Sequence, residues 1–416
     1  MRALLPLLSL CLLPLYALAQ SPDPARVQLD EEGLRLESAD GDFRLELGAL
    51  LQADARLFPA RNADGALDTL LLRRVRPILG GRVFGLYDFR LVPDFGGGEA
   101  RIEDAYVDAR PSAALRLRAG RFKAPFGLEY LQSDADMPFP ERALPTNLVP
   151  NRDVGLQLHG ELREGLVHYA LGVFAGAVDG TSTDEDEDDG KDVMVRHFAH
   201  PLRPLGVGAL EHLGVGFALS YGSTRGAQGL PVYRTSGRRT FFRYRAVEPP
   251  QDVPIVAGGE RIRLSPQAYY YVGPLGLLAE YVASTQEVDS QRLAGRRRLT
   301  HTAWQATGSF VLYGGSAAHG GVKPRTPFRP SRGEWGALEV ALRHAQLHLD
   351  DSTFPSYGDA SAASAARASA AALNLYLNAV TRVALSVERT TFEGGTAFDV
   401  DPRAELLLLG RVQLSF

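Results

Sequence analysis

Apolar and polar residues alternate with a period of two through most of the chain. In residues 43–58, every second position from Phe43 to Leu57 is apolar, whereas the positions between them include Arg44, Asp54 and Arg56. Such alternation predicts a β-strand with one apolar and one mostly polar face. Strands of soluble sandwiches usually have about five or six residues. A strand of this length, with an apolar outer and a polar inner face, is typical of a transmembrane barrel.

Sixteen segments alternate in this way. Their approximate bounds are 43–58, 69–82, 83–94, 100–110, 113–122, 153–163, 165–178, 191–201, 212–224, 260–273, 275–287, 299–313, 333–349, 367–378, 381–392 and 403–416. An even count of this size is typical of bacterial barrels that enclose a water-filled channel. We therefore predict an all-β fold, a 16-stranded antiparallel transmembrane β-barrel over residues 41–416.

The connections should alternate between short turns, such as Gly80-Gly81, and long loops. The loop at 123–152 has no periodic pattern, and structureless loops of this length are usually functional. We expect it to fold into the lumen and narrow the pore. The connection 314–332 falls on the turn side yet is long, so we expect it to enter the mouth of the barrel with its basic residues. These are Lys323, Arg325, Arg329 and Arg332. A miscounted strand is the alternative.

The N-terminal segment has the features of a secretory signal peptide. Residues 1–19 have a short basic start, an apolar core and the small-residue site Ala17-Leu18-Ala19. The single cysteine, Cys11, lies inside this segment, so disulfides and thiol chemistry are excluded from the mature chain. Residues 20–40 contain two short alternating pieces around Glu32-Gly33 and predict a small periplasmic hairpin below the barrel.

The charge balance is slightly acidic, with 45 Lys+Arg against 49 Asp+Glu, which argues against a nucleic-acid partner. Only Lys123, Lys191 and Lys323 are lysines, so arginine supplies almost all the positive charge. Guanidinium groups are planar, always charged and able to bind oxyanions in bidentate fashion.

Arginines recur on the predicted inward faces of the strands. By register they are Arg44, Arg56, Arg74, Arg76, Arg82, Arg90, Arg116, Arg118, Arg343, Arg382 and Arg411. At an effective dielectric constant near 20, two unit charges about 4 Å apart interact by about 4 kcal/mol. A few uncompensated arginines at a constriction would therefore favour anions. A generic polar lining, with the arginines paired to inward acids, is the alternative.

Other segments carry weaker signals. The acidic run 184–189 predicts a solvated outer loop, and a divalent-cation site that bridges lipopolysaccharide is the alternative. The Ala/Ser-rich stretch 359–372 predicts a flexible loop entering a strand of small residues, and a close subunit contact is the alternative. The histidines, including His344 and His348, suit lumenal polar positions. No catalytic or metal-binding motif is evident, so neither cofactor nor metal is expected.

Several motifs together resemble one family. They are the string from Gly120 to Glu129, the paired arginines in Leu72-Arg73-Arg74, the run from Asp104 to Asp108, and the stretch from Gly333 to Glu339. These resemble the phosphate-selective porin family of bacterial outer membranes over essentially the whole mature chain. The aromatic last residue, Phe416, also resembles the end of outer-membrane barrels. The resemblance implies a homotrimeric porin whose inward loop and paired arginines form an anion constriction.

Carried over by position, the resemblance makes Arg73 and Arg74 the constriction arginines and Glu103 their acidic partner. Two positions depart from the family pattern. Leu50 and Ala135 stand where phosphate-selective members have an arginine and a lysine. Lys123 is the candidate that partly replaces these two cations.

From these features we predict a porin of the bacterial outer membrane for passive diffusion of small anions, such as phosphate or other oxyanions. A general or weakly selective porin for small hydrophilic solutes is the alternative. The expected partners are small inorganic anions, outer-membrane lipid with lipopolysaccharide, and two further copies of the chain. An outer-membrane barrel enzyme and a secreted β-rich adhesin are the rival classes.

Overall fold

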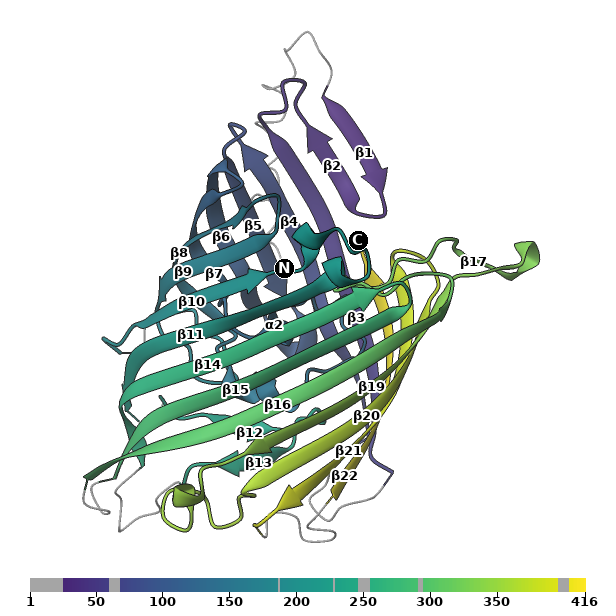
Figure 1. Ribbon diagram of the computed structural model, residues 1–416. Coiled ribbons are helices and arrows are strands. Elements are labelled where there is room, and N and C mark those ends of the chain that lie inside the picture. The colour runs from purple at the N-terminus through teal and green to yellow at the C-terminus, as the bar shows by residue number, and fades with distance from the viewer. Residues whose placement is uncertain are drawn as a thin grey trace, which may run out of the picture.

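The computed structural model describes residues 25–59, 68–185, 188–226, 229–245, 255–290, 295–395 and 404–416, and the predicted signal peptide lies outside these ranges. Within them, sixteen antiparallel strands form a closed barrel (Figure 1). The barrel closes because the last strand pairs with the first one, from Leu408↔Leu57 to Ser415↔Leu50. The 16-stranded fold predicted from the alternation is confirmed.

The barrel strands match the sixteen alternating segments closely. They are β3 (Arg44–Leu57), β4 (Thr69–Val83), β5 (Tyr87–Asp94), β6 (Arg101–Ser112), β7 (Leu115–Lys123), β8 (Arg152–Leu162), β9 (Val167–Phe174), β10 (Asp192–Ala199), β11 (Leu213–Gly226), β14 (Val256–Val272), β15 (Leu275–Ser290), β16 (Gly295–Tyr313), β19 (Ala337–His348), β20 (Ala365–Tyr376), β21 (Thr381–Glu393) and β22 (Ala404–Ser415). The wall is built from strands of unequal length, because β5, β9 and β10 have 8 residues whereas β16 has 19.

The alternation places apolar side chains outside. Along β3, Leu51 and Leu57 are 41% and 44% exposed, whereas Gln52 and Asp54 are buried in the interior. An outward apolar band with polar groups inside matches lipid outside and water inside. None of the helices in the described part of the chain is long and apolar enough to cross a bilayer.

The two ends of the barrel differ in their connections. We call the end with turns such as 84–86 and 113–114 the turn end, and the end with 124–151 and 175–191 the loop end. The glycine pair Gly80-Gly81, expected at a turn, lies inside β4. A Cβ on Gly81 would come 2.9 Å from the ring of Phe89, so the glycine allows close packing there. The actual turn is at Phe84 and Gly85, which both have positive φ.

A hairpin extends the wall at the turn end, formed by β1 (Arg26–Asp30) and β2 (Gly33–Glu37). β2 pairs with β3 from Leu34↔Leu47 to Glu37↔Arg44, directly beyond the end of β22 (Figure 1). Ala49 and Phe416 exchange two backbone hydrogen bonds where the two partners of β3 meet. The edge of β3 is therefore covered along its length by two different segments.

The long connection at the turn end behaves differently from the prediction. Residues near Ala317 and Val322 are buried, but the part formed by β17 (Phe328–Arg329), η7 (Pro330–Arg332) and β18 (Glu334–Trp335) projects away from the barrel (Figure 1). Lys323, Arg325, Arg329 and Arg332 are exposed. Arg329 and Arg332 lie in this projecting part, so the expectation that these two cations enter the mouth of the barrel is wrong. An arginine-rich hairpin is better hydrated outside than packed among apolar neighbours.

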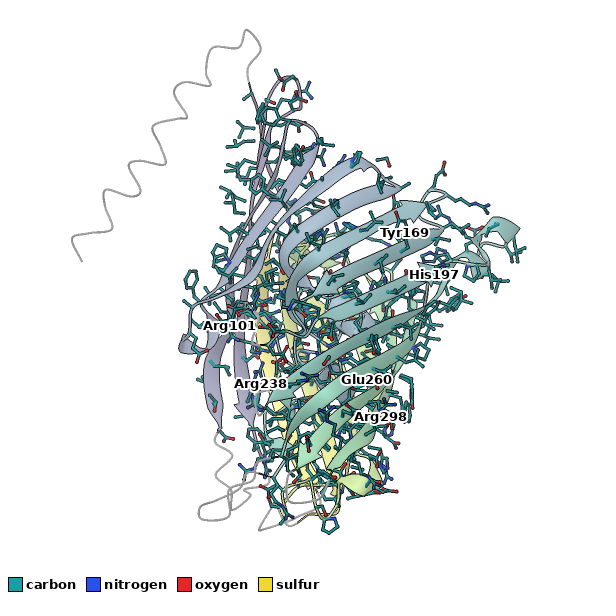
Figure 2. The ribbon with its side chains drawn as sticks, turned by 90° about the vertical axis from the view of Figure 1, so that its left-hand side faces the viewer. Arg101, Tyr169, His197, Arg238, Glu260 and Arg298 are labelled. Carbon is teal, nitrogen blue, oxygen red and sulfur yellow. The ribbon has the colours of Figure 1, made fainter. Side chains whose placement is uncertain are left out.

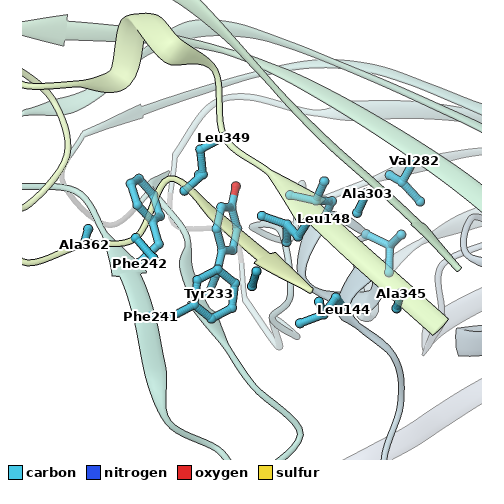
Figure 3. Packing of buried hydrophobic residues seen from close by; sticks show 14 of the residues in the cluster. Leu144, Leu148, Tyr233, Phe241, Phe242, Val282, Ala303, Ala345, Leu349 and Ala362 are labelled. Atoms are coloured by element: carbon cyan, nitrogen blue, oxygen red, sulfur yellow. The ribbon is translucent and has the colours of Figure 1, made fainter. Parts of the chain in front are cut away.

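Two segments occupy part of the lumen. Residues 124–151 include α2 (Leu128–Leu131) and η3 (Leu144–Leu148), and a second hairpin is formed by β12 (Val232–Arg234) and β13 (Thr240–Arg243). Tyr233, Phe241 and Phe242 of this hairpin share one apolar cluster with Leu144 and Leu148 (Figure 3). Part of the interior is therefore an apolar core, whereas the sequence pattern predicts water there.

The Ala/Ser-rich stretch is largely strand. Ala366, Ala368, Ala370 and Ala372 of β20 are all buried. Ala370 and Ala372 pack with Phe139 of the segment 124–151. Small side chains on this wall leave room for that segment, and the strand of small residues expected at the end of this stretch is confirmed from Ala365 onwards. The remaining short helices are η2 (Gly96–Gly98), η4 (Arg203–Leu205), η5 (Leu210–His212) and η8 (Asp351–Thr353).

Candidate permeation site

Two cavities lie in the barrel interior. One, of about 980 Å³, reaches turn-end residues such as Pro111 and Glu161, and we call it the turn-end cavity. The other, of about 1300 Å³, reaches loop residues such as Thr181 and is called the loop-end cavity. Both are lined by Arg76, Asp134 and Arg152, a set that we call the junction. A solute that crosses the barrel through these cavities passes these three charged groups.

A β-bulge in β4 directs two consecutive arginines to the loop-end cavity. The pairing register between β3 and β4 shifts at Arg73, so two residues of β4 stand opposite one residue of β3. Neighbouring side chains of a regular strand point to opposite faces, and a bulge redirects one of them. Arg73 and Arg74 therefore both line the cavity.

The turn after β5 supports this bulge. Asp94 Oδ1 accepts hydrogen bonds from the amides of Val75 (3.0 Å) and Gly96 (2.9 Å). Its other oxygen accepts from Arg76 Nε at 2.7 Å. A Cβ on Gly96 would lie 2.6 Å from the carbonyl oxygen of Arg73, so this close approach requires glycine. Asp94 thus fixes the backbone of β4 and one face of Arg76.

A second bulge, in β6, brings two consecutive acids inward. The register between β5 and β6 shifts at Glu103, next to Asp104. Arg152 donates to Asp104 at 2.8 Å and forms an ion pair with Glu103 at 2.6 Å. Arg76 also pairs with Glu103, at 3.1 Å. The two junction arginines are therefore joined through a shared carboxylate.

Asp134, on the segment 124–151, carries the negative charge of the junction. Its Oδ2 accepts from Arg76 Nη1 at 2.5 Å, and its Oδ1 lies 3.2 Å from Arg74 Nη2. Arg142 also donates to Oδ1. Although burial opposes ionisation, the guanidinium groups of Arg142 and Arg74 hold the pKa of Asp134 well below its usual range. Asp134 is therefore a fixed anion held by three arginines.

Glu141 is a second anion that is held by several arginines, nearer the loop end than Asp134. Arg73 donates to both of its oxygens, at 2.5 and 3.2 Å. Arg56 lies at 3.1 Å, Arg411 at 3.5 Å and Arg238 at 4.0 Å from the same carboxylate. Despite burial, Arg73 and Arg238 hold the pKa of Glu141 well below its usual range. Arg101 and Arg238, labelled in Figure 2, line this cavity from β6 and from the segment between β12 and β13.

Inward side chains of the wall bind the backbone of the segment 124–151. The carbonyl oxygens that accept are those of Asp134 from Gln52 (3.0 Å), Ala135 from Gln413 (3.0 Å), Met137 from Arg382 (2.7 Å), Pro138 from Asn374 (2.8 Å) and Pro140 from Arg411 (2.5 Å). Phe139 packs under the guanidinium of Arg343 at 4.3 Å. The segment is therefore attached to β3, β19, β20, β21 and β22.

The turn-end cavity has a strongly basic lining. Eight lining residues are basic, against three acidic ones, Asp104, Asp134 and Glu161. The basic residues are Arg76, Arg90, Arg110, Arg116, Arg118, Lys123, Arg152 and Arg196. Arg116 and Arg118 both donate to Asp108, at 2.9 and 2.7 Å. Arg118 also lies 4.2 Å from the ring centre of Tyr106. The cavity thus combines fixed guanidinium groups with an aromatic wall.

Asp136 lies where the segment 124–151 meets the connection 314–336. Gln132 donates to the carbonyl oxygen of His319 at 2.7 Å, and a Cβ on Gly321 would lie 2.9 Å from Asp136. Burial raises the pKa of Asp136 to about 6, against the opposing effect of Arg382 and the two lysines 123 and 323. Burial lowers the pKa of His319 to about 4. Asp136 therefore changes charge near neutral pH.

The structure divides the ten sequence-derived candidates into four groups, with Arg76 belonging to two of them. The loop-end cavity is lined by Arg73, Arg74, Arg76 and Glu103, and the turn-end cavity by Arg76, Lys123, Arg116 and Arg118. Arg56 and Arg411 are bound to Glu141 beside the first group. Arg44 lies at the turn end with Glu37 and Glu46 and is among the lining residues of neither cavity.

Several charged residues of the site were not among the candidates. They are Asp94, Asp134, Glu141, Arg142 and Arg152. For Asp134, Glu141 and Arg142, the signal that could have found them is a run of charges inside an aperiodic, proline-rich loop between two barrel strands. The hypothesis of uncompensated arginines is wrong at the junction, because Arg76 and Arg152 both have carboxylate partners.

The acidic run 184–189 is described only in part. Asp184 forms an ion pair with Arg121 at 2.5 Å, and Asp188 accepts from the amides of Gly190 and Arg225. Among the described residues, no group of three or more His, Cys, Asp or Glu side chains could hold a metal ion.

A closed 16-stranded barrel with charged lumenal cavities and an inward segment between β7 and β8 defines an outer-membrane channel. The chain matches the model of the family described as phosphate-selective porin O and P over residues 45–390, and it belongs to that family. The protein is thus a porin, and its location is the outer membrane of the Gram-negative type.

Solved structures share the fold at low sequence identity. The outer membrane channel DcaP of Acinetobacter baumannii has a TM-score of 0.56 and 11% identity, with 91% of this chain and 99% of that chain covered. OmpT of Vibrio cholerae gives 0.54 and 9%, with coverages of 92% and 100%. Salmonella typhi OmpF in complex with daunomycin gives 0.53 and 11%, with coverages of 91% and 100%. No curated protein matches the chain.

Proposed function

We propose that this porin passes small inorganic anions in preference to cations. The observation that carries the proposal is the charge of the two linings. Basic residues outnumber acidic ones by eight to three in the turn-end cavity. In the loop-end cavity ten arginines, at positions 73, 74, 76, 101, 121, 142, 152, 225, 234 and 238, stand against seven acids, at 94, 103, 134, 141, 184, 185 and 188. A path lined by one sign of charge concentrates the opposite ion.

The segment 124–151 is proposed as the constriction. It places Asp134 against Arg74 and Arg76 of β4. Asp134 and Arg76 line both cavities, and Arg74 lines the loop-end cavity. Transport would then be passive diffusion past fixed charges, without a covalent step. The family and the fold favour a channel rather than an enzyme.

A weakly selective porin is the second candidate, and one observation favours it. Each junction arginine is bound to carboxylates, Arg76 to Asp94, Glu103 and Asp134, and Arg152 to Glu103 and Asp104. Local neutralisation of this kind lowers the selectivity that the net charge of the lining would give.

Single-channel recording in planar bilayers with a KCl gradient distinguishes the two candidates. We expect a reversal potential that favours chloride. A reversal potential near zero would support the weakly selective porin, and one that favours potassium would refute anion preference. Titration with phosphate in the same membranes shows whether phosphate blocks the chloride current.

A homotrimer in contact with outer-membrane lipid and lipopolysaccharide is also proposed. Its support is the fold, since OmpT of Vibrio cholerae, at a TM-score of 0.52 and 8% identity, is described in a trimer form. Mass measurement of the detergent-solubilised porin would test this, and a monomer mass would contradict it.

A further inference from the structure

The constriction contains two carboxylates in environments that would suit a free oxyanion. Asp134 is held by Arg74, Arg76 and Arg142. Guanidinium groups bind carboxylates and phosphates with the same forked geometry. A cradle that fits one of these groups therefore fits oxygens of the other.

The cradle around Glu141 is independent of the first one. Arg56, Arg73 and Arg411 surround this carboxylate within 3.5 Å. Arg238 approaches it at 4.0 Å from another segment of the lumen. The two cradles use different arginines for their ion pairs, so the two carboxylates can be removed one at a time.

The segment 124–151, which carries both carboxylates, is also attached to the barrel wall by contacts that do not involve them. Gln52 binds the carbonyl oxygen of Asp134, and Arg411 binds that of Pro140. Arg382 and Phe139 attach the residues between them. The segment therefore has anchors that do not depend on the two carboxylate groups, and removal of one carboxylate should leave its arginines in place.

We propose that Asp134 and Glu141 are tethered counter-ions that occupy two oxyanion sites of the constriction and so set the specificity of the channel. A tethered group competes with a free ligand at an effective concentration of about millimolar or more. Phosphate and sulfate therefore bind the wild-type constriction weakly and pass without blocking it. The assignment rests on the proposed passage of anions and names the residues that keep the passage open to them.

The test is block of chloride current by inorganic phosphate, measured in planar bilayers on the full-length porin. The variants are Asp134→Ala and Glu141→Ala. The matched control is Glu339→Ala, which also removes one buried lumenal carboxylate. Glu339 accepts hydrogen bonds from Asn374 (3.1 Å) and Tyr376 (2.8 Å), both neutral groups.

Emptying either cradle should lower the half-blocking phosphate concentration about tenfold relative to wild type, because the arginines that bind the carboxylate each lose one anionic partner. The control should stay within about twofold of wild type. Equal half-blocking concentrations in wild type and both cradle variants would overturn the proposal. A shift as large in the control would also overturn it, since any added positive charge would then suffice.

Folding is checked by heat-dependent migration on electrophoresis, and the two cradle variants are independent of each other if one fails to fold. The reversal potential of the wild type is measured in the same membranes. Preference for potassium there would refute the proposed function, while the phosphate titration would still decide the role of the two carboxylates.

Discussion

Arg76 is the residue whose removal tests the permeation path most directly. It lines both cavities and binds Asp94, Glu103 and Asp134 at 2.7, 3.1 and 2.5 Å. Arg76→Ala removes a cation and leaves these three carboxylates with fewer partners. We expect the preference for chloride over potassium to fall.

The size of the expected fall in chloride preference follows from the charges of the junction. Arg76 and Arg152 against Asp134 give a formal charge of +1, which becomes zero in Arg76→Ala. A unit charge about 5 Å from a permeant ion contributes about 3 kcal/mol at an effective dielectric constant near 20. Carboxylate pairing and mobile ions reduce this effect. A change of about 1.4 kcal/mol, or about tenfold in the permeability ratio, is the expected result.

The assay is the reversal potential across a planar bilayer at two mean salt concentrations. The screening length is about 10 Å at 0.1 M and about 3 Å at 1 M. The effect of Arg76→Ala should therefore be large at the lower concentration and small at the higher one. Arg76→Lys keeps the charge but loses the fork, so it should retain most of the selectivity.

Arg44→Ala is the matched control, because Arg44 lies at the turn end with Glu37 and Glu46, outside the lining of both cavities. It removes the same charge from the protein. If Arg76→Ala shifts the reversal potential no more than Arg44→Ala does, solutes do not pass the junction and the proposed path is refuted.

Three further outcomes are expected. Burial raises the pKa of Asp136 to about 6, so its negative charge is lost as the pH falls through that value. The preference for chloride should therefore rise at low pH, as a step in the pH profile of the reversal potential. Asp136→Asn should remove this step. Gly96→Ala places a Cβ 2.6 Å from the carbonyl oxygen of Arg73, so it should displace the bulge, lower chloride preference and destabilise the barrel by about 1–3 kcal/mol in thermal unfolding. Phe139→Ala removes a buried anchor of the segment 124–151, a loss of about 3–5 kcal/mol in an apolar core, and should increase single-channel conductance and open-channel noise.

Each of these predictions has its own control. Phe139→Leu keeps the apolar contact and should record like wild type. Gly80→Ala adds a Cβ whose nearest neighbour is 3.6 Å away, so it should leave selectivity and stability unchanged. A pH step that persists in Asp136→Asn would assign it to another group, such as a lumenal histidine.

The barrel could be predicted because its physics is local. Each strand of a membrane barrel must separate lipid from water, which imposes the period-two pattern seen from Phe43 to Leu57 and in fifteen further segments. Register within a strand then indicated which arginines face the lumen, as for Arg74 and Arg76. Those two do line the loop-end cavity.

The bulges could not be read from this pattern. The extra residue of each bulge, Arg73 in β4 and Glu103 in β6, shifts the alternation of inward and outward positions by one. The sequence does not indicate this shift, although the bulge places neighbouring charged side chains on the same face of the strand. The resemblance to a family singled out Arg73 and Glu103, whereas periodicity alone would have placed Arg73 in lipid.

The contents of the lumen depend on contacts far apart in sequence. Tyr233 and Phe242 lie in the long connection between β11 and β14, yet they are buried against Leu148 inside the barrel. The sequence signal for this burial was the presence of aromatic residues in a long loop, where polar residues are expected. The alanines of β20 gave the complementary clue, since a wall of small residues makes room for a filler.

The three junction residues and both bulges lie between Arg73 and Arg152, in one continuous stretch of eighty residues. Much of the wall that faces the passage and the segment that narrows it are thus encoded side by side, while Arg56, Arg238 and Arg411 complete the site from other parts of the chain. In evolutionary terms, this stretch could be exchanged between relatives as a cassette. Such an exchange would replace the junction and both bulges together while leaving the other strands of the barrel unchanged.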